Sequence, residues 1–228
     1  MKSGQRLAQV IEEWILDERL PAGTNLGSES ELVTRYGVSR PVFREAVRLV
    51  EHEGLAEMRK GPSGGLTVVE PDHIAVTHGA AVWLRRNQAT LEDLFATREI
   101  LEPACALRAA QRCGSEARSR LDGLLAHQRE LAAGEDYADY NSCVLEFHQL
   151  IAELSGNKVA WLFTQALGEL TIAFAGAPSY STEQLEETDE AHRLIAEAII
   201  GGDGPLASHR MIVHMRASRR FGQHLRGC

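Results

Sequence analysis

The sequence predicts a mainly α-helical protein in two parts: a small N-terminal domain that includes one β-hairpin, and a larger all-helical domain. Two observations support this fold class. Residues 28–54 have the pattern of two short helices joined by a tight turn, and β-forming residues follow them. Beyond residue 70, apolar residues recur at helical spacing almost to the end of the chain, with capping residues and glycines at the interruptions. We therefore assign residues 1–70 to the first domain and residues 71–228 to the second.

The first domain begins with an amphipathic helix predicted over residues 5–19. A second helix begins after Ser28, because Ser28 and Glu31 form a Ser-x-x-Glu capping box in which each side chain binds the other residue's backbone N–H. Gly37 ends this helix, since glycine adopts a positive φ without the strain that other residues incur.

The third helix carries two separate stripes of residues. Ser39 is expected to cap it, and Pro41 is tolerated in its first turn. One stripe is apolar and should pack on the domain core: Val42, Ala46, Leu49 and Val50. The other is basic and recurs every four residues: Arg40, Arg44 and Arg48. Two such helices joined by a tight turn are typical of a helix-turn-helix whose second helix enters the major groove of DNA.

A β-hairpin is predicted directly after the third helix. Residues 55–58 form a first strand, residues 59–65 a basic turn, and residues 66–69 a return strand. A helix-turn-helix followed by a hairpin with a basic tip is a winged helix-turn-helix. The alternative is an ordinary helical hairpin whose arginines lie on a solvated face, because charged helix faces are common. The hairpin favours the DNA-binding interpretation.

Composition excludes some classes of protein. The chain has 228 residues, of which 44% are hydrophobic and 25% charged, as in an ordinary globular protein. No apolar run approaches the roughly 20 residues that span a bilayer, and the N-terminus has no signal-peptide core. The cysteines form no Cys-x-x-Cys pair, so we expect thiols in a reducing cytoplasm: Cys105, Cys113, Cys143 and Cys228.

The net charge of −8 argues against a non-specific DNA-binding protein. Residues 1–70 contain nine Lys/Arg and eleven Asp/Glu, so even the first domain is slightly acidic. A non-specific binder gains its affinity by displacing counterions from many phosphates. DNA binding must therefore rely on locally clustered cations, doubled in a homodimer, and a structural protein that coats the chromosome is disfavoured.

Seven helices are predicted in the second domain, as in an α-helical bundle. Their approximate ranges are residues 73–86, 90–113, 115–134, 137–155, 157–175, 181–201 and 206–225. Ser115 and Asn157 are among the expected capping residues. Four large side chains are expected to pack in the core rather than contact a ligand: Trp83, Trp161, Met211 and Met215.

Three histidines are candidates for a metal site: His148, His192 and His214. Each lies on a different predicted helix, so all three can meet inside a bundle, where metal and ligand sites are built. Three imidazoles with an open position suit zinc or a similar divalent ion. The spacing alone is not specific, because the chain has nine histidines and any three could be chosen.

A longer motif runs through the first domain. It comprises Asp17, Leu20, Gly23, Leu26, Ser28, Glu29, Glu31, Leu32, Gly37, Val38, Ser39, Arg40, Pro41, Val42, Arg44, Glu45, Ala46, Glu53, Gly54, Leu55, Gly61, Gly64 and Gly65. With this motif, residues 5–70 resemble the DNA-binding domain of GntR-family transcriptional regulators. The resemblance implies that six residues face the operator: Ser30, Ser39, Arg40, Arg44, Lys60 and Gly61. The family often has arginine where this chain has Ser30, and an arginine can pair bidentately with guanine O6 and N7.

A second motif lies in the helical domain. It comprises Arg98, Leu101, Glu102, Glu146, Phe147, His148, Ile151, Ala152, Ser155, Gly156, Asn157, Glu190, Ala191, His192, Ile195, Ala198, Ile199, Gly202, Asp203 and His214. Residues 72–225 thereby resemble the FCD ligand domain of the FadR branch of that family. The resemblance implies a divalent metal, with zinc expected, held by three histidines and an aspartate. Beside the metal it implies a pocket for a small carboxylate, which Arg98 also contacts.

One of the implied metal ligands is missing. The family's aspartate lies four residues before the first histidine, one helical turn away, where this chain has Val144. The metal is then either held by three neutral histidines with water or an effector oxygen, or absent. Loss of the anionic ligand weakens the attraction for a divalent cation and favours an anionic effector in its place. Without the resemblance, the simplest role for Arg98 is an i,i+4 pair with Glu102 on a solvent-exposed helix face.

These observations predict a sequence-specific transcriptional regulator, acting as a repressor, that binds a pseudo-palindromic double-stranded operator as a homodimer. A small organic acid is expected to modulate operator binding from a site formed by four residues: Arg98, His148, His192 and His214. No membrane contact is expected. The alternative is a three-histidine metal-dependent enzyme with an appended helix-turn-helix, in which Glu146 or Glu190 would act as the general base.

Overall fold

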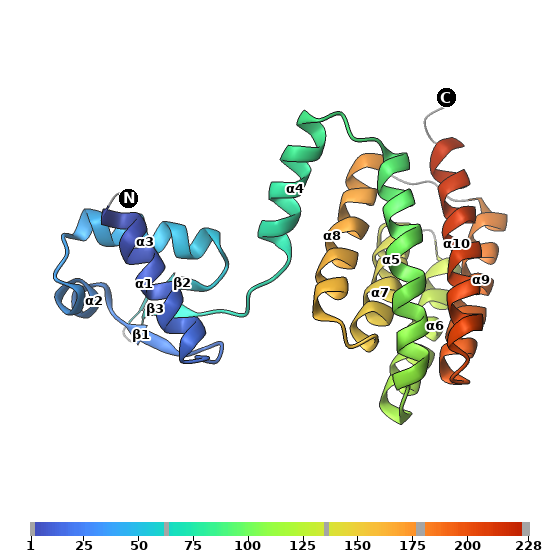
Figure 1. The fold of residues 1–228 in the computed structure, drawn as a ribbon, viewed down its shortest axis with the longest axis horizontal. Coiled ribbons are helices and arrows are strands. Elements are labelled where there is room, and N and C mark those ends of the chain that lie inside the picture. The colour runs from blue at the N-terminus through green and yellow to red at the C-terminus, as the bar shows by residue number, and fades with distance from the viewer. Residues whose placement is uncertain (1–2, 62–63, 135–136, 177–180, 225–228) are drawn as a thin grey trace. The chain divides into compact units, whose positions relative to one another are not determined.

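The computed structural model of the chain describes four stretches, residues 3–61, 64–134, 137–176 and 181–224. Residues 62–63 of the predicted hairpin turn and Cys228 lie outside them. The chain forms two compact units, residues 1–75 and residues 76–228 (Figure 1). No described helix is long and apolar enough to cross a membrane.

The first unit is a winged helix-turn-helix, as the sequence predicts. Its elements are α1 (Ser3–Asp17), β1 (Asn25–Gly27), α2 (Glu29–Tyr36), α3 (Arg40–His52), β2 (Ala56–Arg59) and β3 (Gly65–Val68). α1 and α3 pack against each other, and α2 lies beside α3 (Figure 1). The strands form an antiparallel sheet in the order β1-β3-β2, in which β2 and β3 are the two strands of the wing.

The caps around the turn between α2 and α3 follow the prediction only in part. The Glu31 N–H donates to Ser28 Oγ at 3.3 Å, and the Ser28 N–H donates to Glu31 Oε2 at 2.8 Å, so the predicted capping box is present. Gly37 ends α2 with a φ of 62°, which favours glycine. Ser39 occupies the N-cap position, but its side chain makes no capping hydrogen bond, which leaves the hydroxyl free for another partner.

The apolar face of α3 is rotated relative to the predicted stripe. Its buried residues are Phe43, Ala46, Val47 and Val50, at positions i, i+3, i+4 and i+7. Val42 and Leu49, which were predicted to belong to this face, are only half-buried. The helix turns so that the ring of Phe43 is fully buried, because an aromatic side chain removes more apolar area from water than valine does.

Strand β1 was not predicted from the sequence. It has only three residues, with Asn25 opposite Thr67 and Gly27 opposite Leu66 of β3. So short a strand shows no alternation that a sequence pattern could reveal. Gly65 permits the close approach of β1 and β3, since a Cβ atom there would lie 2.5 Å from the carbonyl oxygen of Gly27.

The second unit is an all-helical bundle with seven helices in its described residues, as predicted. They are α4 (Ile74–Arg86, which begins just before the unit boundary), α5 (Leu91–Arg112), α6 (Ser115–Ala132), α7 (Tyr137–Leu154), α8 (Lys158–Ala175), α9 (Thr182–Ile200) and α10 (Gly204–His224). The N-cap of α6 is Gly114 rather than the predicted Ser115, which is the first helical residue. Asn157 caps α8 as predicted, with its Oδ1 accepting from the N–H groups of Val159 and Ala160.

Helix α5 lies at the centre of the second unit and packs against α7, α8, α9 and α10 (Figure 1). Met211 and Met215 are fully buried in this core and Trp161 is half-buried against it, in agreement with the prediction. The prediction for Trp83 is wrong, because 63% of this residue is exposed. No residue of α4 is buried. The bundle core therefore forms around α5 and includes buried residues of α6, but none of α4.

Candidate DNA-reading surface and histidine cluster

The six residues expected to face DNA lie on α2, at the start of α3 and at the end of the wing. Ser30, Ser39, Arg40, Arg44, Lys60 and Gly61 are all exposed. Gly61 has a φ of 117°, a conformation that favours glycine at the hairpin tip. The start of α3 also presents backbone N–H groups that have no partner inside the helix, and such helix ends bind phosphate.

Arg44 forms an ion pair with Glu29 of α2 at 3.1 Å, and 63% of the arginine side chain is exposed. An exposed pair of this kind contributes roughly 0–1 kcal/mol to stability. Arg44 can therefore exchange Glu29 for a base edge or a phosphate at little cost, while the buried ring of Phe43 fixes the helix beneath it.

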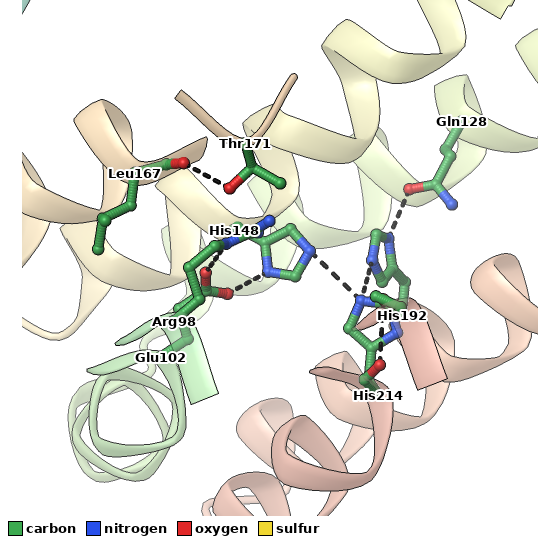
Figure 2. A network of polar contacts seen from close by, with 9 residues as sticks. Arg98, Glu102, Gln128, His148, Leu167, Thr171, His192 and His214 are labelled. Atoms are coloured by element: carbon green, nitrogen blue, oxygen red, sulfur yellow. Dashed lines mark hydrogen bonds and ion pairs between the residues drawn. The ribbon is translucent and has the colours of Figure 1, made fainter. Parts of the chain in front are cut away.

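Three histidines from three helices meet inside the second unit (Figure 2). His148 comes from α7, His192 from α9 and His214 from α10, and each is at most 5% exposed. The Nε2 atom of His214 lies 3.2 Å from that of His192 and 3.3 Å from that of His148. One ring nitrogen from each of the three histidines lies within 4.8 Å of those from the other two.

These distances fit a metal ion. Zinc–nitrogen bonds of about 2.0–2.1 Å in a tetrahedral site place the ligand nitrogens about 3.3 Å apart. The cluster therefore supplies three nitrogen ligands at suitable separations. Val144, one turn before His148 on α7, is half-buried and offers no ligand atom. The described residues thus hold the histidine ligands of the implied site without its aspartate.

The outward-facing ring nitrogens of two of the histidines contact oxygen atoms. His148 Nδ1 lies 2.5 Å from Glu102 Oε2, and neither atom has another polar partner among the described residues. His192 Nδ1 lies 2.7 Å from Gln128 Oε1. Figure 2 shows these contacts on opposite sides of the cluster.

Arg98 and Glu102 pair on α5 at 2.6 Å, as their spacing suggests, but not on a solvent-exposed face. The arginine side chain is 9% exposed and the glutamate side chain 2%. Burial alone would raise the pKa of Glu102, but the Arg98 guanidinium and His148 outweigh it and hold that pKa at about 2. Glu102 is therefore a carboxylate at neutral pH, directly behind a proposed metal ligand.

Burial also sets the protonation of the histidines. Removal from water, with His148 nearby, lowers the pKa of His214 to about 3. Burial, followed by the neighbouring His214 and His148, lowers the pKa of His192 well below its ordinary value. Both rings are therefore neutral at physiological pH, which is the form that binds metals.

Several residues of this network were not predicted as site residues. Gln128 of α6 and Asp189 of α9 are far apart in the sequence, and only the fold brings their side chains together. Asp189 precedes His192 by three residues, a spacing that places both on one helix face and could have drawn attention to it. By contrast, Glu146 and Glu190, the general-base candidates of the enzyme alternative, are exposed, and Glu190 pairs with Arg193 at 2.6 Å.

Comparisons with known proteins agree with both parts of the structure. Residues 93–217 match the FCD domain, and residues 3–64 match the bacterial regulatory proteins of the gntR family. The chain belongs to the GntR family. It is a DNA-binding transcriptional regulator with an FCD domain, which confirms the family and the fold class predicted from the sequence.

Relatives of this GntR regulator include named regulators. It is 30% identical to the Uxu operon regulator of Haemophilus influenzae over 68% of its own chain and 55% of that protein. It is 25% identical to the HTH-type transcriptional repressor NanR of Cronobacter sakazakii over 95% of its chain and 84% of NanR. Among solved structures, Streptococcus agalactiae GntR matches with a TM-score of 0.75 at 24% identity, covering 95% of this chain and 99% of that one, and shares its fold.

Proposed function

We propose that this regulator is a cytoplasmic homodimer that represses transcription from a pseudo-palindromic operator, and that a small organic acid alters its operator affinity. The acid binds in the FCD domain beside a divalent metal, with zinc the first candidate, held by His148, His192 and His214. The observation that carries the proposal is the convergence of three buried Nε2 atoms near the buried guanidinium of Arg98.

Operator reading is assigned to six residues: Ser30, Ser39, Arg40, Arg44, Lys60 and Gly61. Their exposure supports the assignment, as does the free Ser39 hydroxyl at the start of α3. Contacts to phosphates set the register of the helix, and arginine contacts to base edges supply specificity. A homodimer doubles a half-site that is weak in one chain, because the first domain has no excess of positive charge.

The charges of the cluster favour an anionic effector. Arg98 and Glu102 cancel each other, so three neutral imidazoles alone would surround a divalent cation. An oxygen of an organic acid would supply the negative charge that Val144 does not. The contact between Arg98 and Glu102 uses the guanidinium Nε, and a guanidinium has four further N–H donors for a carboxylate.

Regulation requires that the acid bind the DNA-competent and DNA-incompetent arrangements with unequal affinity. Helices α5, α7, α9 and α10 each contribute a residue to the site. An acid that contacts the metal and Arg98 together would draw α5 toward the other three helices. A rearrangement of this kind, passed on through α4, would change how the two winged helices of a dimer meet the operator.

Operator binding with and without effector tests this function. Duplexes are selected from a randomised pool, and fluorescence anisotropy then measures affinity with zinc and a panel of hydroxy- and dicarboxylic acids. We expect sequence-specific binding that shifts at least about tenfold with an acid and metal together, which corresponds to about 1.4 kcal/mol of coupling. His192→Gln should retain operator binding and lose the response, whereas His127→Gln, at an exposed histidine of α6, should retain both. Absence of any sequence-specific duplex at every salt and effector concentration would refute the proposal.

A further inference from the structure

Gln128 forms a bridge between His192 and a carboxylate that lies away from the cluster. It is 1% exposed, and its Oε1 lies 2.7 Å from His192 Nδ1. Its Nε2 donates to Asp189 Oδ1. The same Asp189 oxygen accepts a second hydrogen bond from the hydroxyl of Tyr140, at 3.0 Å. Three helices, α6, α7 and α9, thus hold the amide in one place.

This arrangement determines where the proton of His192 lies. A carboxylate oxygen only accepts hydrogen bonds, so Asp189 requires the NH₂ end of the Gln128 amide. The amide oxygen is then the end that faces His192, and it also only accepts. His192 must therefore carry its proton on Nδ1, which leaves a lone pair on Nε2, the atom that faces the other histidines.

His148 is held by a parallel contact. Its Nδ1 lies against Glu102 Oε2, and a carboxylate likewise requires a proton on that nitrogen. With the proton on Nδ1, the nitrogen that a metal would use is Nε2, the atom that faces His214. His214 differs, because its Nδ1 has no hydrogen-bond partner among the described residues. The Nδ1 atoms of His148 and His192 are thus fixed as donors to oxygen atoms, whereas that of His214 is not.

We propose that Gln128, held by Asp189, is a positioning residue that presets the tautomer and ring orientation of His192 for metal binding. The inference rests on the proposed metal site, and it adds residues that do not themselves touch the metal. A metal-bound histidine generally donates its other N–H to an oxygen, and loss of that oxygen costs about 10–100-fold in metal affinity. Gln128 would therefore act on the metal site only through the ring of His192.

The test compares Gln128→Leu with Gln111→Leu, a control at an exposed glutamine of α5. Leucine keeps most of the volume of glutamine but cannot accept the His192 proton. Zinc affinity is measured by competition with a chromophoric chelator, and thermal unfolding of metal-free protein reports on folding. We expect Gln128→Leu to bind zinc about 10–100-fold more weakly, and Gln111→Leu to match the natural chain. Equal zinc affinity in the two variants would overturn the proposal.

Asp189 offers a graded test that leaves Gln128 in place. Asp189→Asn keeps a carbonyl oxygen that can accept from both Gln128 and Tyr140, so zinc affinity should stay within about threefold. Asp189→Leu removes the group that orients the amide, and zinc affinity should fall about as far as in Gln128→Leu. This difference would contradict a role of the Asp189 charge alone, since asparagine and leucine both remove the charge. Equal affinity in the two Asp189 variants would count against the proposal.

A measurement without metal separates failure of this inference from failure of the proposed function. In protein labelled with ¹⁵N-histidine, long-range ¹H–¹⁵N correlation spectra report which ring nitrogens carry protons. We expect His192 and His148 to carry the proton on Nδ1. Gln128→Leu should change the protonated nitrogen of His192 and leave that of His148 as it is. If the natural chain binds no zinc, the proposed metal site fails while the tautomers still decide the role of Gln128. A proton on His192 Nε2 in the natural chain would overturn the inference even if zinc binds.

Discussion

The buried pair of Arg98 and Glu102 gives the largest predicted effect of a single substitution. Arg98→Leu removes the cation and leaves the Glu102 carboxylate in a site where its side chain is only 2% exposed. The pKa of Glu102 is held at about 2, against an ordinary value of 4.5. At about 1.4 kcal/mol for each unit of pKa, this difference corresponds to roughly 3 kcal/mol of stabilisation of the carboxylate. Loss of one partner from a buried pair typically costs about 3–5 kcal/mol, a similar range.

Arg193→Leu is the matched control for this substitution. Arg193 pairs with Glu197 at the same i,i+4 spacing and also with Glu190, but 39% of its side chain is exposed. Loss of an exposed pair should cost less than about 1 kcal/mol. Urea unfolding at pH 7, followed by circular dichroism, measures both variants, and the two units are fitted as separate transitions. Adding Glu102→Gln to Arg98→Leu should recover part of the loss, because the unpaired charge is then gone. Equal losses in Arg98→Leu and Arg193→Leu would refute the reasoning.

Three further predictions concern other parts of the chain. Burial and then Glu53 raise the pKa of Glu12 to about 7, so the stability of the first unit should fall as pH rises through 7. Glu12→Gln should raise the urea midpoint of this unit at pH 8, and a midpoint independent of pH in the natural chain would contradict the prediction. Val144→Asp adds a carboxylate one turn before the first histidine and should raise zinc affinity at least about tenfold, as measured by calorimetry. An unchanged zinc affinity would show that this position does not face the metal. Arg44→Ala should cost about 1–3 kcal/mol of binding free energy on the selected operator but little on random DNA. Lys60→Ala should weaken binding to both DNAs and lower the salt slope of binding by about one in anisotropy titrations. The opposite pattern would mean that Lys60 reads bases and Arg44 contacts phosphate.

The sequence predicts features of this protein that depend on local chemistry. The capping box at Ser28 and the αL glycine at Gly37 involve residues only a few positions apart, and both appear where predicted. The order of helices in the second unit follows for the same reason, since each begins or ends at a local signal. The hairpin of the wing also needs only neighbouring residues, and β2 and β3 pair accordingly.

Features that depend on packing between distant segments were not predictable in the same way. The buried face of α3 turns toward Phe43 because α1 packs against that side. The prediction that Trp83 is buried fails because residue type alone does not say which helix covers another. In the site, the family motif indicates the three histidines, but Gln128 and Asp189 lie 61 positions apart and become neighbours only in the fold.

The charges of the histidine cluster determine how metal and effector should depend on each other. Arg98 and Glu102 cancel, and burial keeps His192 and His214 neutral by lowering their pKa values, so these groups add no net charge before a metal binds. A divalent ion would then lack compensation, because Val144 supplies no carboxylate. An organic acid that supplies the missing negative charge must raise the affinity for the metal. By linkage, the metal must raise the affinity for the acid by the same factor. We therefore expect zinc affinity to rise at least about tenfold with the effector, and the operator response to disappear in chelator. Equal zinc affinity with and without a responding acid would mean that the acid acts from another position in the bundle.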